Sequence, residues 1–216
     1  MDERLIQQQE QELAKTGRYY LHVCFMTIPL LCMACFLYGL RPLLLCGAAL
    51  LTGNLCDRLV SLLRRRVYRA GDFSNESFAL IIALLMPATV DWYVVIMAVL
   101  AGVLIGKEVF GGTGMNVFNP ALLARAFAFF AYTPSMSGAT VWIAGMTEDM
   151  KNVAANIPGY VPQVVDGFSG ATALENLSTT GQMGYSAMDA FLGFIPGCIG
   201  ETSTLAILLG AAILLF

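Results

Sequence analysis

The chain has 216 residues, of which 57% are hydrophobic and only 12% are charged, and its formal net charge is −3. A soluble domain carries roughly 25% charged residues, so this composition excludes an ordinary soluble protein and indicates an integral membrane protein. The small negative charge, with no extended basic face, excludes a nucleic-acid partner.

The N-terminal stretch, residues 1–18, is polar and rich in charged residues and glutamine. We expect it to be a cytoplasmic lead-in, either amphipathic or disordered, to a membrane domain of about five helical segments over residues 19–133. The first apolar run, from Tyr19 to about Gly39, is long enough to cross roughly 30 Å of hydrocarbon.

Further apolar runs follow at residues 43–63, 73–88, 92–105 and 121–132. The second run ends in the sequence RRRVYR, and clustered arginines beside a span mark the cytoplasmic side of a membrane. Counting crossings from a cytoplasmic N-terminus places the loop of residues 134–186 outside the cytoplasm. Residues 187–216 are then expected to begin a second membrane half, with a helical run over residues 187–199 and a final run from Thr202 that is still apolar at Phe216.

The sequence GKEVFGGTGMNVFNPALLARAF, residues 106–127, joins the fourth and fifth runs and has two interpretations. In the first it is a turn that caps a helix, because Asn119 before Pro120 is a natural N-cap. In the second, the amides of Asn116 and Asn119 hydrogen-bond the edge of a planar heterocycle, and Gly112 lets the backbone approach it closely. Polar backbone at membrane depth is tolerated where it lines such a cavity.

Three ionisable residues lie in or beside the apolar runs. Arg125 stands inside the short fifth run, and a charged residue at that depth should face protein, water or a bound group. Glu76 and Glu108 lie near the cytoplasmic ends of their runs. They are either interface carboxylates without a special role or an entry point for Na⁺ or a proton.

The six cysteines fall mostly within apolar runs, where buried thiols pack as small apolar residues. The alternative is that Cys32 and Cys35 form a redox or cluster ligand pair, but no second pair lies nearby to complete four ligands, so we predict no metal site. The sequence also contains no general acid–base pair or nucleophilic triad, so we expect no hydrolytic catalysis and no catalytic residue of that kind.

The expected extracytoplasmic loop contains a small flexible motif, DGFSGAT, made of Asp166, Gly167, Phe168, Ser169, Gly170, Ala171 and Thr172. The glycines keep the chain thin, and the Thr172 hydroxyl is accessible to a modifying enzyme. Asp166 supplies a negative charge that could help to dock a metal-dependent transferase. On spacing alone a plain connecting turn remains an alternative.

Four motifs carry a family resemblance, and they stand in the order NESFALIIALLMPA, GKEVFGGTGMNVFNPALLARAFAFFAYTP, VDGFSGATALE and GCIGETS. Together, from about Phe73 to Thr204, they resemble the RnfD component of the Rnf electron-transport complex. They are also similar to the NqrB component of the sodium-pumping NADH:quinone oxidoreductase, which shares the fold. The resemblance implies an all-α, multi-span protein of the bacterial cytoplasmic membrane. It further implies two five-helix repeats, as in the urea transporter, of which this chain holds the first and part of the second.

The resemblance also implies cofactors and partners. FMN would be attached through its phosphate to Thr172 by a separate flavin transferase outside the cytoplasm, within the motif that begins at Asp166. A second, non-covalent riboflavin would lie near Asn116 and Asn119. Thr140 follows a similar SGA sequence but has a proline where the motif has its acid, so it should stay unmodified.

The implied partners are the other components of an Rnf-type complex, in which electron transfer between ferredoxin and NAD drives Na⁺ or H⁺ across the membrane. Two alternatives remain open. One is the NqrB component of the sodium pump, and the other is a small-solute channel of the same fold without a flavin.

Overall fold

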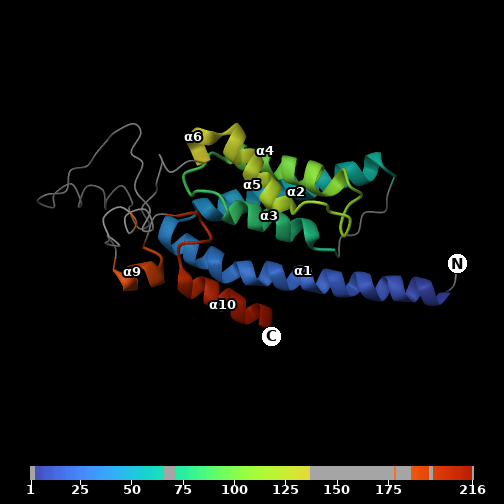
Figure 1. Ribbon diagram of the computed structural model, residues 1–216, viewed down its shortest axis with the longest axis horizontal. Helices are drawn as coiled ribbons and strands as arrows, with labels where there is room; N and C mark the ends of the chain where they lie inside the picture. The colour runs from blue at the N-terminus through green and yellow to red at the C-terminus, as the bar shows by residue number, and fades with distance from the viewer. Residues whose placement is uncertain (1–2, 66–71, 137–177, 179–185, 195–196, 216) are drawn as a thin grey trace, which may run out of the picture.

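The computed structural model describes residues 3–65, 72–136, 178, 186–194 and 197–215. Throughout these residues the regular structure is helical, and the only strand-like pairing is an isolated bridge between Pro87 and Cys198. The prediction of an all-α chain is therefore confirmed for this part of the protein (Figure 1).

Two of the described helices are long and apolar enough to cross a membrane. α1 (Glu3–Tyr38) contains the candidate span Ala14–Tyr38, and α2 (Arg41–Leu63) is a candidate over its whole length. α1 begins at Glu3, so the expected lead-in is helical and continues directly into the span. Glutamine, glutamate, lysine and arginine are good helix formers, and a helix that is already nucleated by a span extends at little cost.

Among the next elements, α3 (Ser74–Leu84) is shorter than the apolar run that predicted it. It is followed by α4 (Trp92–Ala101), which continues directly into a π-helix, η1 (Gly102–Glu108), and then by α5 (Pro120–Ala131). At 1.5 Å per residue α3 rises only about 16 Å, roughly half of the hydrocarbon thickness. The run predicted over residues 73–88 is therefore a half-length helix followed by an irregular segment.

The remaining described helices are α6 (Thr133–Met136), α9 (Ala187–Leu192) and α10 (Thr204–Leu215). The helical run expected over residues 187–199 ends early, because Gly193 adopts φ +105° and terminates α9. α10 lies along α1, where a side chain at Gly210 would come within 3.0 Å of a backbone oxygen of α1 (Figure 1).

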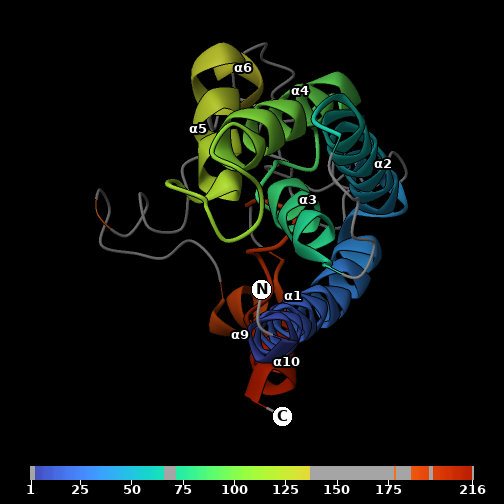
Figure 2. The same ribbon diagram turned by 90° about the vertical axis from the view of Figure 1, so that its right-hand side faces the viewer.

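Seen along the helices, α3 lies in the middle of the described bundle (Figure 2). α2, α4 and α5 lie to one side of it and α1 to the other, with α10 beyond α1. Figure 1 shows the N-terminus of α1, the C-terminal end of α2 and the N-terminal ends of α3 and α5 toward one end of the molecule. α6 and α9, the described elements that flank the loop of residues 134–186, lie toward the other end. The structure of most of that loop lies outside the described residues.

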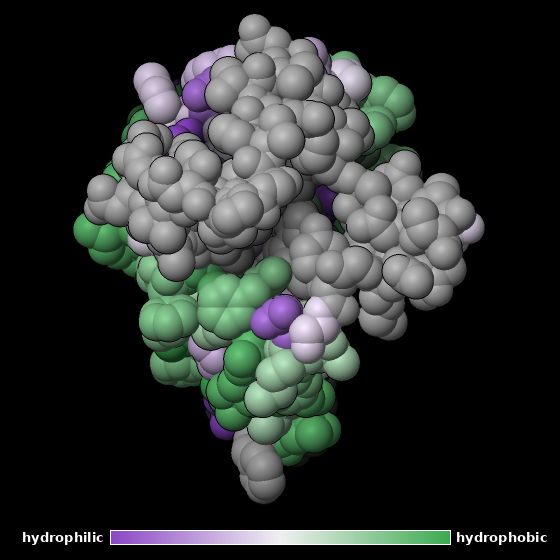
Figure 3. Space-filling model, turned by 90° about the vertical axis from the view of Figure 1, so that its left-hand side faces the viewer, coloured by the Kyte–Doolittle hydropathy of each residue, from purple (hydrophilic) through white to green (hydrophobic). Residues whose placement is uncertain are grey.

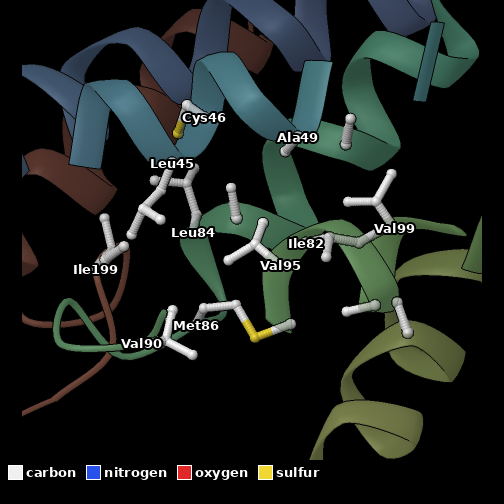
Figure 4. Packing of buried hydrophobic residues seen from close by; sticks show 14 of the residues in the cluster. Leu45, Cys46, Ala49, Ile82, Leu84, Met86, Val90, Val95, Val99 and Ile199 are labelled. Atoms are coloured by element: carbon white, nitrogen blue, oxygen red, sulfur yellow. The ribbon is translucent and has the colours of Figure 1, made fainter. Parts of the chain in front are cut away.

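The core is built from small and β-branched side chains at the junction of α2, α3 and α4. Ile82, Met86 and Val95 are fully buried there, and Ile199 reaches the same cluster from the segment before α10 (Figure 4). The outer surface is apolar where that of a soluble protein is polar: leucines such as Leu51 and Leu62 on α2 are each 75% exposed. Hydrophobic residues also cover much of the described surface seen in Figure 3. Exposed apolar surface on this scale is expected where lipid or a partner covers it.

Candidate functional site

Part of the predicted site falls outside the described residues. These positions are Asp166, Gly167, Ser169, Gly170, Ala171 and Thr172, together with the comparison residue Thr140. The covalent attachment of FMN to Thr172 therefore stays a prediction. The geometry that follows concerns the glycine-rich loop between η1 and α5, and Arg125.

The glycine-rich loop folds back on the end of η1. Gly111, Gly112 and Gly114 have φ values of +126°, +98° and +88°, in the region that only glycine adopts readily. The Gly112 N–H donates to the carbonyl of Lys107 at 3.1 Å, and the Met115 N–H donates to the carbonyl of Gly112 at 3.1 Å. Two successive turns thus bring the chain to Asn116.

Asn119 caps α5. Its Oδ1 accepts the backbone N–H of Ala121 at 2.9 Å and that of Leu122 at 3.5 Å, and Pro120 occupies the first helical position. The predicted N-cap is therefore present. Because the oxygen is used by the helix, the group that Asn119 can still offer to a ligand is its amide nitrogen, on an exposed side chain.

Asn116 offers a hydrogen-bond acceptor, whereas Asn119 offers a donor. Its Oδ1 is buried and has no hydrogen-bond partner among the described residues. Leaving a buried acceptor unpaired costs about 1–3 kcal/mol, so this oxygen is suited to receive a donor from a bound molecule. Within this loop, Asn116 thus carries an acceptor without a described partner, and Asn119 carries an amide nitrogen on an exposed side chain.

Arg125 contacts the chain at the C-terminal end of α3. Its Nη1 donates to the carbonyl of Leu85 at 2.8 Å and lies 3.6 Å from the sulfur of Cys198. The neighbouring carbonyls of Leu84 and Met86 accept backbone N–H groups of the segment around Cys198. The expectation that Arg125 faces a polar partner and not lipid holds, but its contacts are structural. The structure does not bring it to Asn116.

A buried group of charges was missed by the sequence analysis. Lys107 Nζ lies 3.6 Å from Asp57 Oδ1 on α2 and 4.0 Å from Oε1 of Glu108. Lys107 is 2% exposed and Glu108 is 6% exposed. Buried charges are tolerated only when they are paired, so Lys107 holds the end of η1 against α2. The sequence signal for this ion cluster was Asp57, which lies inside the second apolar run.

Glu76, the other carboxylate singled out from the sequence, lies in the first turn of α3. A negative charge at that position stabilises a helix through its dipole.

An open apolar groove of about 500 Å³ lies between α4, η1 and α5, with Leu123 and Phe127 among its lining residues. It includes neither asparagine of the glycine-rich loop.

The fold and this loop define a class: an all-helical membrane protein with half-length helices and an amide-bearing, glycine-rich loop beside a buried ion cluster. Comparison with protein families matches residues 9–216 to the NQR2, RnfD, RnfE family. The chain belongs to this family, as the four sequence motifs predicted.

Several similar proteins are named as the B component of Na(+)-translocating NADH-quinone reductase. The protein from Chromohalobacter salexigens is 46% identical over 154 residues, which are 68% of this chain and 33% of the relative. The protein from Stutzerimonas stutzeri is 44% identical over 149 residues, 65% of this chain and 32% of the relative. The protein from Azotobacter vinelandii is 40% identical over 187 residues, 84% of this chain and 41% of the relative. The chain thus spans about a third to two fifths of the length of these relatives.

Proposed function

We propose that this chain is an electron-transfer component of a membrane complex that couples a redox reaction to the movement of Na⁺ or H⁺. Membership of the family and the printed name of the relatives support this proposal. The two candidate spans and the exposed leucines of α2 support a location in the membrane.

The flavin is the second part of the proposal, and the unpaired Oδ1 of Asn116 is the observation that carries it. The pyrimidine edge of an isoalloxazine ring has an N–H flanked by carbonyls. That pattern matches the acceptor of Asn116 and the amide nitrogen of Asn119. The residues present therefore fit a non-covalent flavin of the riboflavin class. Once bound, a flavin supplies one- and two-electron chemistry, while the protein supplies position and electrostatics.

FMN on Thr172 is the third part. Its support is the motif that begins at Asp166, together with the place of its loop in the chain. The described elements that flank this loop, α6 and α9, lie toward the end of the molecule away from the C-terminal end of α2 (Figure 1). That arrangement suits attachment on the side of the membrane opposite the arginine cluster.

The test uses the full-length protein co-expressed with a flavin transferase and separated by denaturing electrophoresis under ultraviolet light. Wild type and Thr140→Ala should fluoresce, and Thr172→Ala should not. A band that is dark in all three variants would favour the small-solute channel without a flavin.

The donor and acceptor of electrons distinguish the two complexes within the proposal. An Rnf-type complex would pass electrons between ferredoxin and NAD, whereas the name of the relatives points to NADH and a quinone. Purified complex should therefore be assayed with reduced ferredoxin and NAD⁺, and separately with NADH and a quinone. Dependence of the rate on added Na⁺ then identifies the transported cation.

A further inference from the structure

A polar contact joins the start of α3 to the middle of the glycine-rich loop. The Thr113 hydroxyl donates to Asp72 Oδ2 at 2.5 Å, and the Ser74 hydroxyl donates to the same oxygen at 2.9 Å. The two hydroxyl oxygens lie 2.8 Å apart. Hydrogen bonds to a carboxylate are about twice as strong as those between neutral groups. We call Asp72, Ser74 and Thr113 the loop clamp.

The backbone at the start of α3 is arranged for this contact. Phe73, between Asp72 and Ser74, adopts φ +49°, which is rare for a bulky residue. Aspartate and serine are favoured capping residues, yet α3 has no side-chain cap, and both side chains turn to Thr113. Backbone strain of this kind persists where the surrounding structure holds it, and it gathers at functional sites.

The clamp is a side-chain anchor in the middle of a loop rich in glycine. Thr113 stands between Gly112 and Gly114, and glycine permits many backbone conformations. Within residues 111–114 it is the one residue whose side chain can form a hydrogen bond. A turn from Gly112 to Met115 encloses Thr113 and leads directly to Asn116, so the clamp and the buried oxygen of Asn116 belong to one short segment.

We propose that Asp72 and Thr113 are positioning residues for the non-covalent flavin, acting through Asn116. This inference rests on the proposed flavin site. With the clamp closed, the acceptor oxygen is in place before binding, so the ligand does not have to order the loop. With the clamp broken, only the fraction of molecules that presents Asn116 correctly binds, and the dissociation constant rises in proportion.

The experiment measures the dissociation constant of riboflavin on the full-length protein in its complex, after removal of non-covalent flavin, by fluorescence titration. Thr113→Val keeps the side-chain shape but loses the hydroxyl, and it should raise the dissociation constant about tenfold, the effect of losing one hydrogen bond to a charged group. Thr113→Ser restores the hydroxyl and should bind like wild type. Covalent flavin content should be the same in all of these variants.

Thr133→Val is the matched control. Its hydroxyl bonds the carbonyl of Phe129 at 2.9 Å, on α6 at the other end of the molecule, so riboflavin should bind as in wild type. Asp72→Asn keeps the shape of the clamp but removes its charge, and it should raise the dissociation constant severalfold. If Thr113→Val does not assemble, unchanged binding in Asp72→Asn overturns the proposal.

Asn116→Ala separates this inference from the function on which it rests. Loss of riboflavin from Asn116→Ala, with wild-type binding in Thr113→Val and Asp72→Asn, would show that the clamp does not position the ligand, while the flavin site stands. Wild-type binding in Asn116→Ala would remove the flavin site itself and with it the role of the clamp. Equal weakening by Thr113→Val and Thr113→Ser would also overturn the proposal, because the hydroxyl would then not be responsible.

Discussion

Asn119 shows how one side chain serves both the fold and the proposed site. Its oxygen closes the N-terminus of α5, and its amide nitrogen remains for a ligand. The cap could be predicted from the sequence, because Asn-Pro at the start of an apolar run is a local signal. The unpaired oxygen of Asn116 could not be, because it depends on the turns at Gly112 and on the packing around the loop.

The cap gives the first prediction at this scale. Asn119→Ala should lower the free energy of unfolding by about 1 kcal/mol, because two N–H groups of α5 lose their acceptor. Asn119→Asp should retain the cap. Hydrogen exchange at residues 121–123 measures the effect directly, and equal protection in wild type and Asn119→Ala would contradict the assigned role.

The buried ion cluster gives the second prediction. Lys107→Met should lower the free energy of unfolding by about 3 kcal/mol, because the buried Glu108 and the partly exposed Asp57 lose their cation. Adding Asp57→Asn and Glu108→Gln should recover most of the loss. Denaturant unfolding of the full-length protein in detergent measures both. Arg18→Met, at an exposed position, serves as the control and should change stability little.

At the scale of elements, hydropathy identified the helices, but it did not locate the end of every one. The second run was predicted over residues 43–63, and α2 covers Arg41–Leu63, because Pro42 and the arginines bound it clearly. α3 instead ends at Leu84, where a distant segment takes over its carbonyls: the N–H of Gly200 donates to Leu84 at 2.8 Å. A contact between residues so far apart leaves no local signal in the sequence.

The π-helix is a second feature that periodicity did not reveal. η1 continues α4 directly and turns both Lys107 and Glu108 inward, which places one of them near Asp57 on another helix. π-helical turns are rare and often lie at functional sites. The pairing of Lys107 with Asp57, fifty residues earlier, emerges only in three dimensions.

Close packing of η1 against α5 gives the prediction for this scale. A methyl group at Gly102 would lie 2.7 Å from the Pro120 carbonyl oxygen and 2.8 Å from Cβ of Ala124. Gly102→Ala should therefore lower the free energy of unfolding by about 1–3 kcal/mol through overpacking. Gly47→Ala, where nothing lies within 4 Å, is the matched control. Thermal unfolding compares them, and equal midpoints would argue against this packing.

At the scale of the whole molecule, described helices from both sides of the loop of residues 134–186 pack into one body. α10 packs along α1, and the segment around Ile199 enters the core formed by α2, α3 and α4. The family and the all-helical architecture were predictable from motifs and composition. The short length of α3 and the contacts made at its two ends could not be predicted, because both arise from contacts between distant segments.

The two ends of α3 also separate two parts of the proposed function. Its N-terminus holds the glycine-rich loop, and its C-terminal end meets Arg125 and the segment around Cys198. The non-covalent flavin is proposed at the first end. The covalent FMN is proposed on the loop whose flanking helices lie toward the second end (Figure 1).

The central claim is that this protein carries electrons on a flavin bound to its own chain. Mass spectrometry of the proteolytic peptide that contains Thr172, from protein matured with a flavin transferase, tests it most directly. The account predicts a phosphoester-linked FMN on that residue. An unmodified Thr172 in fully matured protein would contradict it.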